Sequence, residues 1–241
     1  SLNPEFKPGH FVLTDQFIDF TKNRITTFYD GEGRPVAHLD VTDPYCPELR
    51  SMIMAAGQEL KLNMHNGGTY VCTEGPRFET PAEIKMFHML GGDTVGMTNV
   101  PEVNLANEAE MAYATISMIT NFAAGISPEA LTHSEVVEMM ADMAEQLKAL
   151  ILKTIEAIDV DAQFKAHNRM YEYGGFQLEA EKELKVLNGQ GKSSFFSIKQ
   201  NYRLKFNTST SQIGASWRKP LRCSAFVGLQ LSAFLLLTAL Y

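Results

Sequence analysis

Cysteine is scarce in this sequence, and the three that occur are Cys46, Cys72 and Cys223, with no Cys-x-x-Cys pair among them. A disulfide framework and a paired-cysteine metal site are therefore excluded. No basic segment followed by an apolar run, the pattern of a secretory signal, opens the sequence. We expect a reducing, cytoplasmic setting and no bound metal.

A basic excess is also missing, since the net charge is −7. This balance argues against a nucleic-acid surface over the chain as a whole, and we expect no nucleic-acid partner. The hydrophobic share of 45% and the charged share of 20% are ordinary for a globular protein. A length of 241 residues gives room for one domain with a sizeable core.

Aspartate is absent after Asp161, and the charge changes sign near this point. Residues 1–164 hold 10 basic and 24 acidic residues, a net charge of −14, whereas residues 165–241 hold 11 and 4, a net charge of +7. We therefore predict one domain over residues 1–162. We expect residues 163–241, called the tail below, to be an unrelated basic segment without a packed fold.

The tail ends in a charge-free apolar run, residues 223–241, which follows the basic sequence RKPLR. This run is near the roughly 20 residues that cross a bilayer, and a basic flank favours a cytoplasmic start. Membrane contact through residues 223–241 is thus one interpretation. We favour the other interpretation, that these residues are unrelated sequence without a membrane role.

Strand and helix patterns alternate along the predicted domain. β-Branched and aromatic residues favour strands over residues 10–20, 67–73 and 94–97, and the apolar run 112–120 predicts a central strand. Helical spacing predicts helices over residues 47–60, 81–90 and 101–111, with a loop over 23–35. A further helix is expected from Thr132, whose spacing to Glu135 is that of a capping box. The alternation indicates an α/β fold with helices covering a sheet.

Two polar side chains lie at the ends of predicted strands, which is where α/β proteins usually bind ligands. Glu79 stands between a strand and a helix, and its carboxylate only accepts hydrogen bonds, so it suits a ligand edge that donates. One example of such an edge is the N1–H of hypoxanthine, and another is the N1–H with the amino group of guanine. Asn121 ends the run 112–120, and its amide both donates and accepts. The alternatives are a helix-start glutamate favoured by the helix dipole and an Asx turn.

For four further residues the sequence is compatible with either a structural or a ligand-binding role. Thr98 could bind phosphate and Met97 could flank a sugar, or they are a turn threonine and a core methionine. Tyr70 and Phe78 could face a ribose or a base, although aromatics in such strands usually lie in the core.

Two histidines are also candidates. His133 lies in the first turn of the last predicted helix, where it could bond a sugar 5′ group or be a solvated residue. His38 precedes an acidic, proline-containing run. It is either a site residue or a residue of a surface loop.

Five short motifs occur in the order in which they occur in a known family: Thr69-Tyr70, Gly75 to Phe78, Met97 to Val103, Thr120-Asn121 and His133 to Val136. On these motifs residues 1–158 resemble the trimeric purine nucleoside phosphorylases, which include the methylthioadenosine phosphorylases. The upstream runs DQFIDFT and DPYCPELR resemble the methylthioadenosine branch.

The resemblance implies a nucleoside phosphorylase-like mixed β-sheet flanked by helices. It implies cleavage of a purine nucleoside by inorganic phosphate to the free base and a pentose 1-phosphate, without a metal or organic cofactor. The implied roles are phosphate binding by Thr98, a catalytic base contact by Asn121, and substrate contacts by Tyr70, Phe78, Glu79, Met97, Thr98, His133 and Val136. His38 resembles a histidine that reaches a neighbouring subunit's sugar site, which implies a homotrimer.

Substrate choice follows from the same resemblance. The adenosine-type branch has an aspartate at the strand end, another two residues on, and a serine after the phenylalanine. This sequence has Asn121, Ala123 and Glu79 at those positions. We therefore expect 6-oxopurine nucleosides of the inosine and guanosine type. The alternative is a 5′-methylthioadenosine or 5′-methylthioinosine phosphorylase.

One part of the family pattern has no counterpart here. The family's N-terminal portion supplies a glycine-rich phosphate loop followed by Arg-His, and no such loop occurs in this sequence. We therefore expect an N-terminally truncated form that is inactive or poorly folded by itself. A further alternative is a non-catalytic or tail-anchored subunit that keeps the purine site only.

Overall fold

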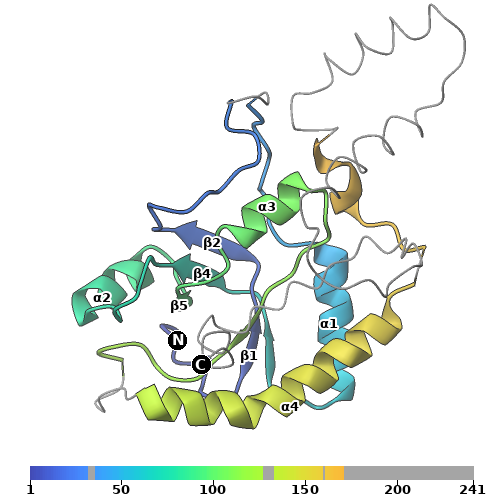
Figure 1. The fold of residues 1–241 in the computed structure, drawn as a ribbon. Coiled ribbons are helices and arrows are strands. Elements are labelled where there is room, and N and C mark those ends of the chain that lie inside the picture. The colour runs from blue at the N-terminus through green and yellow to red at the C-terminus, as the bar shows by residue number, and fades with distance from the viewer. Residues whose placement is uncertain (32–35, 127–132, 160, 171–241) are drawn as a thin grey trace, which may run out of the picture.

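The computed structural model describes residues 1–31, 36–126, 133–159 and 161–170, with the backbone alone at 133–138 and 168. Strands and helices alternate along these residues (Figure 1). The strands are β1 Phe11–Leu13, β2 Gln16–Asp19, β3 Met64–Asn66, β4 Thr69–Cys72, β5 Thr94–Gly96 and β6 Ile116–Met118. The helices are α1 Pro47–Glu59, α2 Pro81–Met89, α3 Glu102–Glu108, α4 His133–Ala157 and the 3₁₀ turn Lys165–Asn168.

The described strands form two three-stranded sheets. In the sheet ordered β3-β1-β6, β1 runs parallel to β3 and antiparallel to β6. In the sheet ordered β2-β4-β5 every pair is parallel, with Phe17 opposite Tyr70 and Tyr70 opposite Thr94. The predicted fold class, a mixed β-structure flanked by helices, is confirmed.

The strand predicted over residues 10–20 is two strands that belong to different sheets. The chain bends after β1, and the β3–β4 connection bends beside it at Gly67 and Gly68, both with positive φ. The Gly67 N–H donates to the Leu13 carbonyl at 3.0 Å, and the Gly68 N–H donates to Asp15 Oδ1 at 2.9 Å. A Cβ at Gly68 would lie 3.0 Å from the Phe6 ring, so glycine permits this corner.

The prediction of a central strand over residues 112–120 is wrong. Only Ile116–Met118 form a strand, and in the described part of the chain it is an edge strand beside the central β1. The apolar run has another cause. Ala112 and Ala114 face the core that includes α1 and α4, whereas Tyr113 packs against Tyr45 and Val103 on the opposite side. An extended segment that is buried on both faces carries the composition of a central strand.

Helices pack on both sheets. α1 and α4 pack together on the β3-β1-β6 sheet through residues that include Phe11, Leu13, Leu49, Ile53 and Leu147. In β4, Val71 packs with α2, while Tyr70 and Cys72 pack with α3, because successive strand residues point to opposite faces. The carboxyl ends of β4 and β5 therefore lie between α2 and α3 (Figure 1).

The helices predicted over 47–60 and 81–90 are confirmed as α1 and α2. The helix predicted over 101–111 is the shorter α3, and Glu110, with φ of 56°, lies just beyond its end. Helix α4 begins at His133. The predicted capping box of this helix falls on Thr132, which lies outside the described residues, and on the side chain of Glu135, which is also not described.

The first residues of the tail pack against the domain. Phe164 and Ala166 join the core between α1 and α4, and Arg169 and Met170 are buried. Residues 171–241, including the apolar run 223–241, lie outside the described residues, so the predicted domain boundary stays a prediction. No helix in the described ranges is long and apolar enough to cross a membrane.

Candidate functional site

Two turns at the carboxyl ends of neighbouring parallel strands form the candidate site. One turn, residues 73–80, joins β4 to α2, and the other, residues 97–101, joins β5 to α3. The Thr73 N–H donates to the Gly96 carbonyl at 2.8 Å, so the turns start side by side. In α/β proteins such strand ends are the usual place for a ligand.

The first turn carries Glu79, which is half-buried. The Thr73 hydroxyl lies 2.7 Å from Glu79 Oε1 and 3.3 Å from the Gly96 carbonyl, so its proton goes to the carboxylate at the shorter distance. Among the described residues no other hydrogen bond reaches this carboxylate. Glu79 therefore has one oxygen fixed by Thr73 and keeps acceptor capacity for a ligand that donates.

The start of α2 fixes the turn on the other side of Glu79. Thr80 and Glu83 form a capping box, in which Thr80 Oγ1 accepts from the Glu83 N–H at 3.2 Å and Glu83 Oε2 accepts from the Thr80 N–H at 2.7 Å. Arg77 adds two bonds to the Glu83 carboxylate, at 2.7 and 2.9 Å. These bonds, those of Arg77 first, lower the pKa of Glu83 to about 2.

The second turn carries Thr98, which is paired with Tyr70. The Tyr70 hydroxyl lies 3.0 Å from Thr98 Oγ1 and accepts from the Thr98 N–H at 3.3 Å. Tyr70 is a core residue, and burial raises the pKa of its phenol, which stays protonated. A phenol that accepts from the Thr98 N–H and donates to Thr98 Oγ1 leaves the threonine proton for an anionic ligand.

The backbone after Thr98 takes an uncommon conformation that its sequence supports. Asn99 has φ of 79°, a region that asparagine tolerates better than most residues. Its side chain is fully buried, donating to the Tyr45 hydroxyl at 2.5 Å and accepting from the Thr115 hydroxyl at 2.9 Å. Two buried bonds thus fix the direction in which the Thr98 turn leaves β5.

Met97 and Phe78 supply apolar surface beside these polar groups. Met97 lies over Gly75, where an added Cβ would come within 2.6 Å of its sulfur. Gly75 also has φ of 74°, so both its space and its conformation favour glycine. Phe78 directly precedes Glu79 and is 52% exposed. An exposed aromatic ring next to an oriented carboxylate suits stacking on a planar base.

Asn121 follows shortly after the end of β6. Its Oδ1 accepts from the Thr120 hydroxyl at 2.6 Å, and its Nδ2 donates to the Phe122 carbonyl at 2.8 Å. An amide has two hydrogens and two acceptor positions, so one of each remains. The Ser1 nitrogen donates to the Asn121 backbone carbonyl at 2.7 Å.

For three predicted site residues the described part of the chain shows no contact with this group. His38 is exposed in the connection between β2 and α1, and no hydrogen bond or ring contact found among the described residues links it to the two turns. His133 and Val136 lie in the first turns of α4, where only the backbone is described. Their proposed substrate contacts stay predictions.

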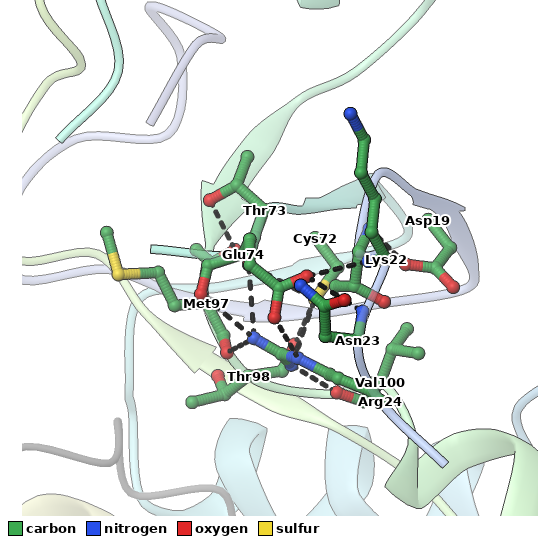
Figure 2. Close-up of polar contacts among 12 residues, drawn as sticks. Asp19, Lys22, Asn23, Arg24, Cys72, Thr73, Glu74, Met97, Thr98 and Val100 are labelled. Atoms are coloured by element: carbon green, nitrogen blue, oxygen red, sulfur yellow. Dashed lines mark hydrogen bonds and ion pairs between the residues drawn. The ribbon is translucent and has the colours of Figure 1, made fainter. Parts of the chain in front are cut away.

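Two residues that the sequence did not indicate take part in the site. Thr73, which orients Glu79, could have been noticed as a hydroxyl at a strand end six positions before the carboxylate. Arg24, whose side chain binds carbonyl groups of both turns (Figure 2), has no local sequence signal. Within the residues described, no group of three or more His, Cys, Asp or Glu side chains could hold a metal ion.

Comparisons with known proteins agree on one family. The family model described as Phosphorylase superfamily matches residues 1–156. The 6-oxopurine nucleoside phosphorylase of Pyrococcus furiosus is 57% identical over 163 residues, covering 66% of this chain and 62% of that protein. A probable S-methyl-5′-thioinosine phosphorylase of Methanopyrus kandleri is 51% identical over 154 residues, covering 64% of this chain and 59% of that protein.

Solved structures give the same result. The crystal structure of a methylthioadenosine phosphorylase from an antarctic soil metagenomic library has a TM-score of 0.67 and 32% identity, covering 75% of this chain and 64% of that one. The chain thus spans less than two thirds of the length of these three proteins.

Proposed function

The chain belongs to the phosphorylase superfamily, and from this premise we propose that the protein is a purine nucleoside phosphorylase acting on 6-oxopurine nucleosides. It cleaves inosine- and guanosine-type nucleosides with inorganic phosphate and releases the base and a pentose 1-phosphate. The observation that carries this proposal is the Glu79 carboxylate, which Thr73 orients at the end of β4 with acceptor capacity left for a donating base.

The chemistry of the base explains this substrate class. A 6-oxopurine presents an N1–H donor, which a carboxylate such as Glu79 accepts. The hydrogen and the acceptor position that Asn121 retains match O6 and a protonated N7 of the same base. An adenine-type base presents a donor at C6 and a bare N1, and Glu79 would then face an acceptor. The names of several relatives, 6-oxopurine nucleoside phosphorylases, support the same choice.

The mechanism that we propose uses the same contacts. Breaking the glycosidic bond makes the sugar cation-like and places negative charge on the leaving base. The Asn121 amide stabilises this charge, and a preorganised donor of this kind contributes roughly 3–4 kcal/mol. Thr98 donates its remaining proton to phosphate, which attacks the sugar carbon from the opposite side. Met97 and Tyr70 lie beside the sugar, and Phe78 stacks near the base.

The remaining parts of the proposal follow from the family. Phosphate is the co-substrate, and the proposed reaction requires no metal or organic cofactor. We infer a homotrimer in which His38 reaches the sugar site of a neighbouring subunit, while His133 and Val136 contact the 5′ side of the nucleoside. A cytoplasmic protein of purine salvage is consistent with the free cysteines Cys46 and Cys72, both buried.

Single-turnover phosphorolysis by the product of the complete gene tests the substrate class. Inosine and guanosine are expected to be cleaved faster than methylthioadenosine, because only their bases donate from N1. Glu79→Ala should remove this preference, whereas Glu145→Ala, which replaces an exposed glutamate on α4, should retain it. Faster cleavage of methylthioadenosine by the unsubstituted enzyme would contradict the proposal.

A 5′-methylthioinosine phosphorylase is the second candidate, and it is favoured by the similarity to a probable S-methyl-5′-thioinosine phosphorylase. Inosine and 5′-methylthioinosine share their base and differ only at the 5′ position. A direct comparison of kcat/KM for these two nucleosides therefore isolates the 5′ group. A preference for the methylthio compound would assign the second candidate and leave the base contacts unchanged.

A further inference from the structure

Arg24 occupies an unusual place between the two turns of the candidate site. It lies in the connection between β2 and α1, yet its side chain crosses to the carboxyl ends of β4 and β5 and is only 18% exposed (Figure 2). Of the five residues that its guanidinium reaches, four offer a backbone carbonyl group. The Arg24 guanidinium therefore binds backbone groups inside the protein and is largely shielded from solvent.

The carbonyl groups come from both turns. Arg24 Nη2 donates to the Met97 carbonyl at 2.6 Å and to the Thr73 carbonyl at 3.2 Å, with the Glu74 carbonyl at 3.5 Å. Arg24 Nη1 donates to the Val100 carbonyl and lies 3.6 Å from the Cys72 sulfur. A planar guanidinium has five hydrogens in a fixed arrangement, so it can bind several carbonyl groups at once.

These carbonyl groups come after the last ladder pair of β4 and β5, where the strands of the described residues offer them no partner. Buried carbonyl groups need a partner, and hydrogen bonds from a charged donor are the stronger kind. One arginine therefore satisfies carbonyl groups that two separate turns leave unpaired. Their positions relative to each other depend on its geometry.

The loop that carries Arg24 is itself fixed to the same turn. The Glu74 carboxylate accepts from the Lys22 N–H at 2.6 Å and from the Asn23 N–H at 3.4 Å, and it lies 3.9 Å from Arg24 Nε. The first of these bonds is the main reason why the pKa of Glu74 is lowered. The contacts thus run in both directions, from the loop to the turn and from the turn to the loop.

Further along, the same loop is held by α3. Glu108 is buried, and its carboxylate accepts from the Thr27 hydroxyl at 2.6 Å and from the Phe28 N–H at 2.7 Å. Arg24 therefore has a supported backbone on both sides. Its position is set by the fold and does not depend on a bound ligand.

We propose that Arg24 is a positioning residue that sets the distance between Glu79 in the first turn and Thr98 in the second. Its Nη2 binds the carbonyl of Thr73, the residue whose hydroxyl orients Glu79. The same nitrogen binds the carbonyl of Met97, the residue before Thr98. The proposal rests on the proposed function, in which Glu79 binds the base and Thr98 binds phosphate.

Kinetics of Arg24→Ala in the product of the complete gene test the proposal. A displacement of about 1 Å between reacting groups can cost about 100-fold in rate, and we expect a fall of that order in kcat/KM for inosine, with a higher KM for both inosine and phosphate. Millimolar guanidinium ion should restore part of the activity, because it can bind the same carbonyl groups. A loss of folded protein alone would lower kcat without raising either KM.

Two further variants keep the test decisive. Arg24→Lys retains the charge but cannot bind the separate carbonyl groups in the arginine geometry, so it should fold and still lose at least about 10-fold in kcat/KM. Lys153→Ala removes the half-buried basic partner of Glu59, far along the sequence on α4, and should change neither KM. Wild-type constants in both Arg24 variants would overturn the proposal.

A measurement without substrate separates this proposal from the proposed function. Backbone amide hydrogen exchange should be faster in both variants over residues 73–80 and 97–101, and unchanged in Lys153→Ala. Unchanged exchange in these two turns would overturn the positioning role even if the enzyme is active. If the unsubstituted protein cleaves no nucleoside, the proposed function fails, and the exchange rates alone decide the role of Arg24.

Discussion

In the proposed function, the choice of base depends on single hydrogen-bonding groups, because the purines that nucleosides carry differ mainly in what they donate and accept. Asn121 has one amide hydrogen and one acceptor position left after its bonds to Thr120 and Phe122. Glu79 has an acceptor left after its bond to Thr73. Changing either group should change selectivity more than it changes stability, since both side chains are only half-buried.

Asn121→Asp replaces an amide that can donate by a carboxylate that only accepts. The 6-amino group of adenosine then gains a partner, while O6 of inosine faces a negative charge. A hydrogen bond to a charged group is worth about 1.5–3 kcal/mol, so the ratio of kcat/KM for adenosine to that for inosine should rise roughly 10- to 100-fold. Steady-state kinetics on both nucleosides measure this ratio. An unchanged ratio would remove Asn121 from the base site.

Thr73→Val removes the hydroxyl that orients Glu79 while it keeps the branched shape of the side chain. Glu79 loses its one hydrogen bond among the described residues, and kcat/KM for inosine should fall about 10-fold, the equivalent of one such bond. Thr73→Ser keeps the hydroxyl and is the matched control, expected to stay near the wild-type value. Equal losses in both variants would show that packing, not the hydroxyl, is what matters at this position.

At the scale of the elements, the site depends on how α2 starts. Pro81 is the first residue of the helix and directly follows Thr80. The capping box of Thr80 and Glu83 satisfies the backbone N–H groups of these two residues. Arg77 binds the same Glu83 carboxylate from within the turn. Glu83 thus binds both Thr80, the N-cap residue of α2, and Arg77 in the turn before the helix.

The capping box gives a pH-dependent contribution to stability. The pKa of Glu83 is lowered from 4.5 to about 2 in the folded state, so its stabilising effect is complete above pH 4.5 and is lost as the pH falls toward 2. The difference in Tm between the wild type and Glu83→Gln should therefore be largest near neutral pH and shrink below pH 4.5. Thr80→Ala, which removes the hydroxyl of the same box, should cost about 1 kcal/mol.

Thermal unfolding between pH 7 and pH 3 measures both variants. Glu145→Gln serves as a control, because Glu145 is exposed on α4 and, among the described residues, pairs with the exposed Lys148 alone, at 3.6 Å. Its Tm should follow that of the wild type at every pH. A Glu83→Gln deficit that stays constant down to pH 3 would mean that the carboxylate charge contributes nothing at the helix start.

The sequence was sufficient to predict elements and residues whose signals are local. The start of α2 was visible from Pro81, and Glu79 and Thr98 were visible as polar residues at strand ends. Arg24 could not be found in this way, because the carbonyl groups that it binds in the two turns lie 49 to 76 positions later in the chain. The division between β1 and β2 was missed for the same reason, since it depends on a corner formed with Gly67 and Gly68.

At the scale of the whole molecule, the last described residues, 164–170, contact several elements of the fold. Phe164 enters the core between α1 and α4. Lys165 lies 3.5 Å from Asp43 in an ion pair, and Arg169 donates to the Asp43 carbonyl at 2.6 Å and to Asn107 on α3. Residues 164–170 therefore connect the helical layer over β1 with the α3 side of the molecule, although the charge pattern assigned them to a different segment.

Phe164→Ala tests whether this connection stabilises the fold. Replacing a buried phenylalanine by alanine removes its hydrophobic contacts and leaves a cavity, which typically costs about 3–5 kcal/mol. Phe164 is 5% exposed and contacts a core that includes Leu49, Ile53 and Leu150. We expect a loss in the free energy of unfolding within that range. Leu152→Ala, on the exposed side of α4 at 53% exposure, is the control and should be nearly neutral.

Urea unfolding, followed by circular dichroism, measures both variants at one temperature. The midpoint for Phe164→Ala should fall well below that of the wild type while the slope stays similar, because a similar area is exposed on unfolding. A midpoint equal to that of Leu152→Ala would mean that residues 164–170 lie on the domain without stabilising it. The domain boundary would then fall before Phe164, where the change of charge along the sequence had indicated it.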